Sequence, residues 1–306
     1  MRCTLCGSKD VVFRYPSKLA LCRSCFVNYI ERKVLSTLRN YSMVKRGDVV
    51  LVCVSGGKDS TTVLHILSKY SRELGIKVIA LTVIEGIRGR KGEVIKVLKR
   101  FCEQRDLEYH VVSFREYFGF DFDEVVAEYM SRGLKPCTVC GVFRRYIVNR
   151  VARELGATKV ATGHNLDDEV QVFLMNLIRG NLPNLVREGQ ITEYLYHEKF
   201  VPRIKPLYYC LEAETAMYAV LNEIYVPWPE CPYAKYSGRY WIRKMVNKLE
   251  ITRPGTKWRL LAAKHFITYA LRELYREYRL STCKYCGEPT SGDVCKVCEL
   301  RSLLRR

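Results

Sequence analysis

The stretch VVLVCVSGGKDS, residues 49–60, decides the fold of this 306-residue chain. Its first six residues are apolar and predict a buried strand, and the apolar spacing after Ser60 predicts a helix. A glycine turn between a strand and a helix start directs backbone N–H groups and the positive end of the helix dipole to one place. The stretch therefore predicts a phosphate site. It differs from the Walker loop, which needs four residues between its first glycine and Gly-Lys-Ser/Thr.

Strands and helices alternate along the chain after residue 48. The predicted strands are residues 76–83, 109–114 and 159–163, and the predicted helices include residues 91–105 and 167–179. This alternation predicts an α/β fold with a doubly wound, Rossmann-like parallel sheet. Ligands of such sheets bind beyond the carboxyl ends of the strands. Because residues 55–60 and 163–168 both follow strands, we expect them to share one pocket.

Eight of the fourteen cysteines form two sets, each made of two Cys-x2-Cys pairs. Four thiolates at this spacing are typical of a closed tetrahedral zinc site. Such a site has no open coordination position, so we interpret both sets as structural zinc fingers. The first set is Cys3, Cys6, Cys22 and Cys25, and the second is Cys283, Cys286, Cys295 and Cys298.

A third set of cysteines has a different pattern. Cys137 and Cys140 form a lone pair, and Cys231 is a candidate third member. Three thiolates could hold a [4Fe–4S] cluster with one iron open. The alternatives are a catalytic pair that works through persulfide and disulfide, or buried structural thiols. The remaining cysteines are predicted to be small core residues: Cys53, Cys102 and Cys210.

The net charge of +19 is concentrated at the two ends of the chain. Residues 1–47 carry +8 and residues 251–306 carry +7, which leaves +4 for the rest. Basic ends around a near-neutral centre favour a polyanionic partner, a nucleic acid, over plain solubility or adaptation to heat. No apolar run approaches the ~20 residues of a membrane span. The N-terminus lacks the apolar core of a signal peptide, so we expect a cytoplasmic protein without membrane contact.

Residues 235–249 are predicted to form a helix in which basic and aromatic side chains are interleaved. These side chains are Lys235, Tyr236, Arg239, Tyr240, Trp241, Arg243, Lys244 and Lys248. The pattern suits contact with an RNA backbone and stacking on its bases. It equally suits a solvated helix that packs its aromatic residues inward. Residues 212–224 and 256–279 are also predicted to be helical, and residues 181–206 are predicted to form a loop.

Taken in order along nearly the whole chain, these motifs resemble the tRNA 2-thiolation enzymes of the TtcA/TtuA family, which carry the PP-loop of ATP-pyrophosphatases. The motifs are the two fingers, residues 55–60, Cys137-x-x-Cys140, residues 161–169 and Glu230-Cys231-Pro232. The fingers and residues 230–234 are similar to the TtuA branch, found in thermophiles; wobble-uridine enzymes share the fingers and the loop.

The predicted domains are a finger at 1–26, a PP-loop domain at 27–250 with a basic connecting helix at 27–47, and a C-terminal helix and zinc ribbon at 251–306.

The resemblance also implies residue roles. The residues it implies for binding ATP and Mg²⁺ are Cys53, Ser55, Gly57, Lys58, Asp59, Ser60, Val83, Arg144, Gly163 and Asp168. Among these, Asp59, Arg144 and Asp168 would be catalytic. Arg144 stands where relatives often carry Lys, and the two cations differ in hydrogen-bond geometry. Cys137, Cys140 and Cys231 would ligate a [4Fe–4S] cluster.

The implied reaction begins with attack of the C2 carbonyl oxygen of a uridine, expected at T-loop position 54, on the α-phosphate of ATP. Pyrophosphate leaves, sulfur then attacks C2, and AMP departs. The implied sulfur donor is a ubiquitin-like thiocarboxylate protein or inorganic sulfide, and the expected assembly is a homodimer. The alternatives are a wobble-uridine 2-thiolase, another PP-loop tRNA modifier such as a lysidine synthetase, or a non-catalytic zinc-ribbon RNA-binding protein. The reaction requires the phosphate loop and the three thiols to open onto a common cavity.

Overall fold

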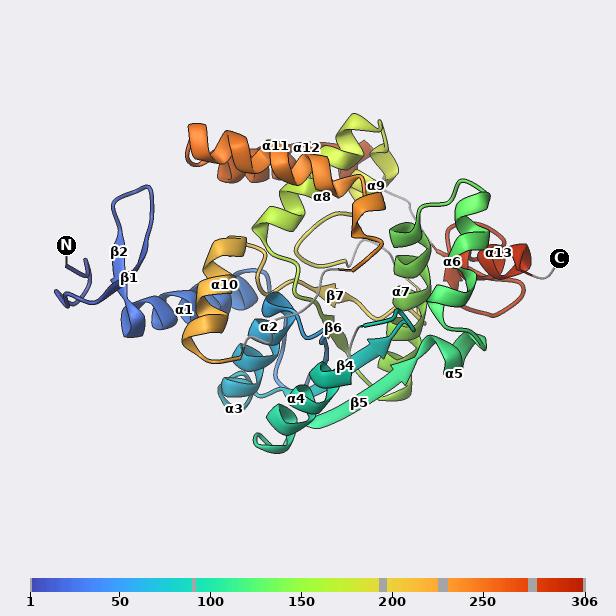
Figure 1. Ribbon diagram of the computed structural model, residues 1–306, viewed down its shortest axis with the longest axis horizontal. Coiled ribbons are helices and arrows are strands. Elements are labelled where there is room, and N and C mark those ends of the chain that lie inside the picture. The colour runs from blue at the N-terminus through green and yellow to red at the C-terminus, as the bar shows by residue number, and fades with distance from the viewer. Residues whose placement is uncertain (1, 90–91, 193–196, 225–230, 275–279, 305–306) are drawn as a thin grey trace.

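The computed structural model describes residues 2–89, 92–192, 197–224, 231–274 and 280–304. Five strands form one parallel sheet in the order β5-β4-β3-β6-β7 (Figure 1). They are β3 Val49–Cys53, β4 Lys77–Ile84, β5 Glu108–Ser113, β6 Lys159–Ala161 and β7 Arg203–Ile204. The chain builds outward from β3 to β5 and then returns to the other side of β3 with β6. This reversal between β3 and β6 leaves a crevice at the carboxyl ends of the strands, and the predicted doubly wound sheet is confirmed.

Helices cover both faces of the sheet. One face packs against α1 Arg23–Asn40, α2 Lys58–Lys69, α4 Gly92–Glu103 and α10 Glu212–Leu221. The other packs against α5 Phe114–Phe118, α6 Phe122–Ser131 and α7 Pro136–Glu154. Along β3, Val50 and Val52 belong to the first core and Leu51 to the second, because successive side chains of a strand point to opposite faces. The six apolar residues before the loop are therefore explained by burial on both faces of the sheet.

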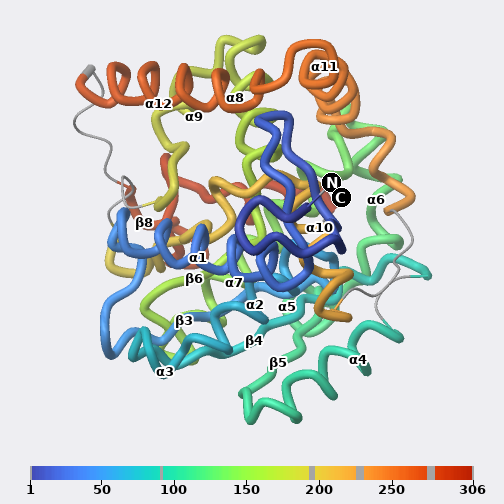
Figure 2. Tube along the Cα trace, turned by 90° about the vertical axis from the view of Figure 1, so that its left-hand side faces the viewer, coloured from blue at the N-terminus to red at the C-terminus, as the bar shows by residue number. Residues whose placement is uncertain are grey.

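A further layer of helices lies along one side of the molecule, where α11 Arg239–Thr252 and α12 Thr256–Leu274 pack on α8 Leu166–Ile178 (Figures 1 and 2). Three short elements lie between the larger ones: α3 Ser71–Leu74, α9 Leu182–Val186 and a 3-10 turn at Ala234–Tyr236. None of the helices that the structure describes is both long and apolar enough to cross a membrane. The sheet, its two helical layers and this outer layer together surround the crevice.

The two four-cysteine sets lie at opposite ends of the molecule (Figure 1). The N-terminal set joins the hairpin of β1 Val11–Arg14 and β2 Ala20–Cys22 to the start of α1. The C-terminal set joins β8 Ser281–Thr282 and β9 Pro289–Thr290 to α13 Lys296–Leu303. Helix α1 begins at Arg23, inside the first set, so the helix predicted at 27–47 starts earlier and ends earlier.

The prediction of a loop over residues 181–206 is wrong, because this segment contains α9 and β7. Asn181 caps α9 by accepting a hydrogen bond from the backbone of Asn184 at 3.2 Å. Strand β7 has only two residues, too few for a hydrophobic period to show in a sequence. The prediction of a helix to residue 279 is confirmed to Leu274, and residues 275–279 lie outside the described residues.

Candidate active site

The turn between β3 and α2 has a shape that only glycine allows. Gly56 has a φ of +90°, and a Cβ there would lie 2.3 Å from a methyl carbon of Val94. The Ser60 hydroxyl donates to the Gly57 carbonyl at 3.0 Å and accepts from the Ser55 N–H at 3.2 Å. These bonds close the turn over the first residues of α2, so that the start of the helix faces the crevice.

The end of β6 presses directly on this turn. A Cβ on Gly163 would lie 2.6 Å from the backbone nitrogen of Ser60 and 2.9 Å from the carbonyl carbon of Asp59. Only a residue without a side chain permits this approach. The close approach brings the two predicted stretches, residues 55–60 and 163–168, to one crevice at the junction of β3 and β6.

The crevice contains a cavity of about 360 Å³. Nine of the ten residues that the resemblance implied for ATP line it. The tenth, Lys58, lies just beside it, where its ammonium contacts Asp59 at 2.9 Å and Glu212 at 3.0 Å. Five other ionisable residues line it: Glu85, Arg145, His164, Arg203 and Arg239. His164 lies within the predicted stretch 163–168, and Arg239 was predicted only as part of the basic and aromatic helix. Glu85, Arg145 and Arg203 lie in segments without a phosphate-binding pattern. Arg203 and Arg239 come from β7 and α11, which meet the site only in the folded chain.

Asp59 and Asp168, two of the three carboxylates that line the cavity, are held in place by different partners. Asp59 accepts hydrogen bonds from Asn165 at 3.1 Å and from the Thr215 hydroxyl. Asp168 accepts from Arg239 at 2.9 Å. The cavity walls limit the access of water to Asp168, and this raises the pKa of its carboxyl to about 6 despite the nearby Arg239 cation. Asp59 also contributes to the raised pKa, because two carboxylates close together resist ionisation.

The neighbours of Asp168 in sequence face away from the cavity. Asp167 is buried and pairs with Lys257 of α12, while Glu169 is buried and pairs with Lys264 of α12 and with Lys205. Although burial opposes ionisation, these two lysines hold the pKa of Glu169 at about 2. Of the three acids that begin α8, only Asp168 lines the cavity, and the other two fasten the outer helical layer to the core.

Four guanidinium groups surround the cavity. Arg144 contacts Glu85 at 3.3 Å, and Arg239 contacts Asp168. Among the residues that the structure describes, neither Arg145 nor Arg203 contacts a carboxylate, and Arg203 donates instead to the Arg145 carbonyl at 3.5 Å. Two such cations side by side repel each other, so the cavity is electrostatically suited to a multiply charged anion such as a triphosphate.

The three cysteines of the third set lie beside this cavity and are not part of its described wall. The Cys137 thiol lies 3.5 Å from the carbonyl oxygen of Tyr233, which brings it to the Cys231 segment. Partial desolvation and the nearby Cys231 thiol raise the pKa of Cys137, while the cations of Arg144 and Arg239 oppose this. Cys137 therefore lies within electrostatic range of two residues of the cavity wall. Glu230, of the predicted Glu-Cys-Pro segment, lies outside the described residues.

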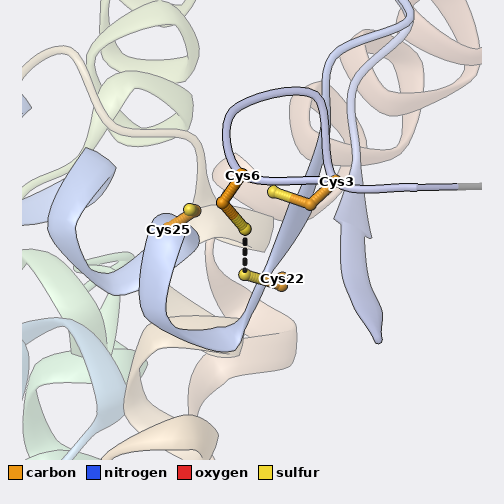
Figure 3. Close-up of side chains that lie close together, drawn as sticks. All are labelled: Cys3, Cys6, Cys22 and Cys25. Carbon is orange, nitrogen blue, oxygen red and sulfur yellow. Dashed lines mark hydrogen bonds between the residues drawn. The ribbon is translucent and has the colours of Figure 1, made fainter. Parts of the chain in front are cut away.

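In both four-cysteine sets the thiols are close enough together to hold a metal ion. In each set the four sulfurs lie within 4.8 Å of one another (Figure 3 shows the N-terminal set). The Cys6 and Cys22 sulfurs are 3.5 Å apart, a spacing that suits thiolates around a single tetrahedral ion. A backbone N–H of Cys22, with others from the Cys3–Cys6 turn, lowers the pKa of the Cys3 thiol to about 6.

The sequence of this chain is similar to those of a known family of proteins. Residues 27–250 match the family described as the PP-loop domain. The chain is 35% identical to the tRNA 2-thiolation protein NcsA of Haloferax volcanii, over 98% of each chain. It is 32% identical to the tRNA-5-methyluridine(54) 2-sulfurtransferase of Pyrococcus horikoshii, over 99% of this chain and 94% of the relative.

A solved structure shares the fold over nearly its full length. The U34-tRNA thiolase NcsA from Methanococcus maripaludis, determined with its [4Fe–4S] cluster, superposes with a TM-score of 0.82. The two chains are 34% identical, and the match covers 99% of this chain and 96% of the other. The similarity therefore includes the terminal fingers and the outer helices as well as the sheet.

Proposed function

Because this chain belongs to the PP-loop family of tRNA 2-thiolation enzymes, we propose that the cavity between β3 and β6 binds ATP and presents its α-phosphate to the C2 oxygen of a tRNA uridine. The overall activity is ATP-dependent tRNA sulfur transfer. One observation supports this assignment of the site above all. The glycine turn, Asp59, Asp168 and four arginines line the same cavity.

The phosphates are bound by groups on three elements that lie in or beside the cavity. The N–H groups at the start of α2 and the Lys58 ammonium meet the phosphate chain from one side. Arg144 and Arg203 meet it from the other, and they stabilise the charge that develops as pyrophosphate leaves. Phosphoryl transfer depends mainly on positioning and charge neutralisation, which this arrangement supplies. Cys53 and Val83, at two strand ends, present backbone to the adenine.

Asp59 and Asp168 are the residues that fit a magnesium ion. They are close enough for one carboxylate to raise the pKa of the other, and carboxylate oxygens are the ligands that Mg²⁺ prefers. The metal would neutralise the phosphates. The Asp168 carboxylate accepts a hydrogen bond from the backbone N–H of Asn165 at 3.2 Å, which fixes its direction.

Cys137, Cys140 and Cys231 are the residues that fit an iron–sulfur cluster. Cys137 and Cys140 share one turn of α7, and Cys137 lies against the segment that carries Cys231. A [4Fe–4S] cluster held by three thiolates supplies one iron with an open position for a sulfur ligand. Tyr233 holds the Cys231 segment in place, since its hydroxyl donates to Asp123 at 2.7 Å.

The proposal also includes finer assignments. We propose that the target is the T-loop uridine at position 54. The wobble uridine U34 is the second candidate, favoured by the structural match to a U34 thiolase. We also propose one zinc in each finger, a ubiquitin-like thiocarboxylate protein or sulfide as the donor, and a homodimer with finger domains at 1–26 and 251–306 around the core.

The test is mass spectrometry of nucleosides from tRNA incubated with anaerobically reconstituted protein, ATP and sulfide. We expect 2-thiouridine that requires ATP and appears with AMP. Fragment mapping then assigns the sulfur to the T-loop or to the anticodon. Absence of any thiolated nucleoside under these conditions, with ATP consumed in the presence of tRNA, would assign the site to another PP-loop tRNA modification such as lysidine formation.

A further inference from the structure

The outward face of α11 carries large aromatic side chains that the core does not use. Trp241 is 71% exposed and Tyr240 is 44% exposed, whereas Val246 on the opposite side of the helix is fully buried. The sequence left open whether these rings pack inward or face solvent, and the structure shows that they face solvent. We call Tyr240, Trp241, Lys244, Met245 and Lys248 the aromatic–basic face; their spacing of three and four residues places them together.

The rings and cations of this face are already arranged in contact. The Lys244 ammonium lies 4.4 Å from the centroid of the Tyr240 ring and 5.5 Å from that of Trp241. Contiguous exposed apolar surface of this kind is unusual away from binding sites. A cation beside two aromatic rings is the combination that binds nucleic acids, because the rings stack on bases and the ammonium contacts phosphate.

Helix α11 and the turn before it carry little acidic charge. Glu250 is the only acid in residues 235–252, and it accepts the backbone N–H groups of Gly255 and Lys257 at 2.8 Å each, where the chain turns into α12. Among the residues that the structure describes, Lys244 and Lys248 form no ion pair, so these two cations remain available to a negatively charged partner. A protein partner would need an acidic surface with cavities for both rings, whereas every unpaired nucleotide offers a phosphate and a flat base.

Helix α11 also leads from this face to the active site. Arg239, its first residue, contacts Asp168 in the cavity, and Arg243, one turn later, contacts Glu212 at 2.8 Å. Glu212 in turn contacts Lys58 beside the phosphate turn. One row of α11 thus faces the cavity, while the adjacent row forms the aromatic–basic face. An RNA strand on the outer row lies within the roughly 20 Å length of this helix from the cavity.

We propose that the aromatic–basic face binds unpaired nucleotides of the tRNA loop that carries the target uridine. Bases stack on Trp241 and Tyr240, and Lys244 and Lys248 contact the phosphates of the same strand. The inference rests on the proposed function and adds where the RNA lies. In this proposal α11 has two roles: one row of its side chains lines the ATP cavity, and the other binds the RNA loop whose uridine enters the cavity.

The experiment measures the Kd of unmodified tRNA for the full-length, anaerobically reconstituted protein at several salt concentrations. We expect Trp241→Ala to weaken binding roughly 5- to 100-fold and Trp241→Phe to restore most of it. Lys248→Ala should lower the slope of log Kd against log salt by about one. Phe266→Ala is the matched control, because Phe266 is 76% exposed on α12 and lies outside the proposed face.

ATP affinity, measured without tRNA, should be unchanged in Trp241→Ala. Equal losses in Trp241→Ala and Phe266→Ala, or no loss in Trp241→Ala, would overturn the inference. A change of oligomeric state in Trp241→Ala with unchanged tRNA binding would also overturn it, and would make the face a contact between copies of the chain. Failure of the wild-type protein to bind or thiolate any tRNA would instead reject the proposed function.

Discussion

The two fingers and the third set of cysteines show two ways in which a chain presents thiols. Each finger gathers four sulfurs within 4.8 Å through a local hairpin and the start of a helix. Among the described residues, Cys137, Cys140 and Cys231 are not gathered so tightly, and they come from two segments that meet only in the folded core. Thiolates that surround one ion must converge, whereas thiolates on separate irons of a cluster stand apart. We therefore propose that the closed sets support the fold and that the open set, beside the cavity, serves the chemistry.

The sharpest test of this contrast removes one thiol from the open set. We expect Cys137→Ala, Cys140→Ala or Cys231→Ala to lower thiolation at least about 100-fold, because metal-ligand loss removes the bound group. ATP binding and zinc content should not change. Cys102→Ala, in the buried core, is the control. Thiolation and iron content that survive each single substitution would break the distinction.

Removing a thiol from a closed set should act on stability first. We expect Cys283→Ser to release about one zinc per chain and to lower the melting temperature, since a structural zinc contributes folding free energy. This finger supports α6 and α7, because Tyr129 of α6 donates to the Leu300 carbonyl at 3.1 Å and Glu288 pairs with Arg153 of α7. Zinc analysis and thermal unfolding measure both effects. An unchanged melting temperature after zinc loss would show that the finger does not brace the core.

The same contrast holds for the acids that begin α8. Lys257→Ala leaves the buried Asp167 carboxylate without its partner, and we expect about 3–5 kcal/mol less stability in urea unfolding. Arg239→Ala removes a cation that is about one third exposed, so its effect on stability should be below about 1 kcal/mol. Equal losses of stability in the two variants would contradict the distinction between Asp167, which fastens the outer helical layer, and Asp168, which lines the cavity.

The smallest predicted effect is a pH dependence. The raised pKa of Asp168, about 6, means that its carboxyl is protonated below that pH in the free protein and ionised above it. If the carboxylate orients the metal, kcat/KM should rise through about pH 6 and then level. Asp168→Asn should lower activity by roughly tenfold or more and remove this step. An unchanged pH profile in Asp168→Asn would assign the step to another group.

The sequence predicted the parallel sheet and the phosphate turn because both rest on local patterns: an apolar run, glycines and a helix start. The finger spacing was equally local. Arg203 and Arg239 could not be predicted, because β7 has two residues and α11 reaches the cavity only through the packing of the outer helical layer. The sequence also could not predict that the Trp241 side chain faces solvent, since the same alternation of aromatic and basic residues fits a helix with its rings packed inward or facing outward.

The most direct measurement compares 2-thiouridine formation by two preparations of the same chain, with ATP, sulfide and tRNA supplied in excess. One preparation is purified in air and carries zinc alone, and the other is reconstituted without oxygen to about four irons per chain. The account predicts thiolation, dependent on ATP, in the iron-loaded preparation and background levels in the other. Equal 2-thiouridine yields from both would contradict the separation of closed structural thiols from an open catalytic set.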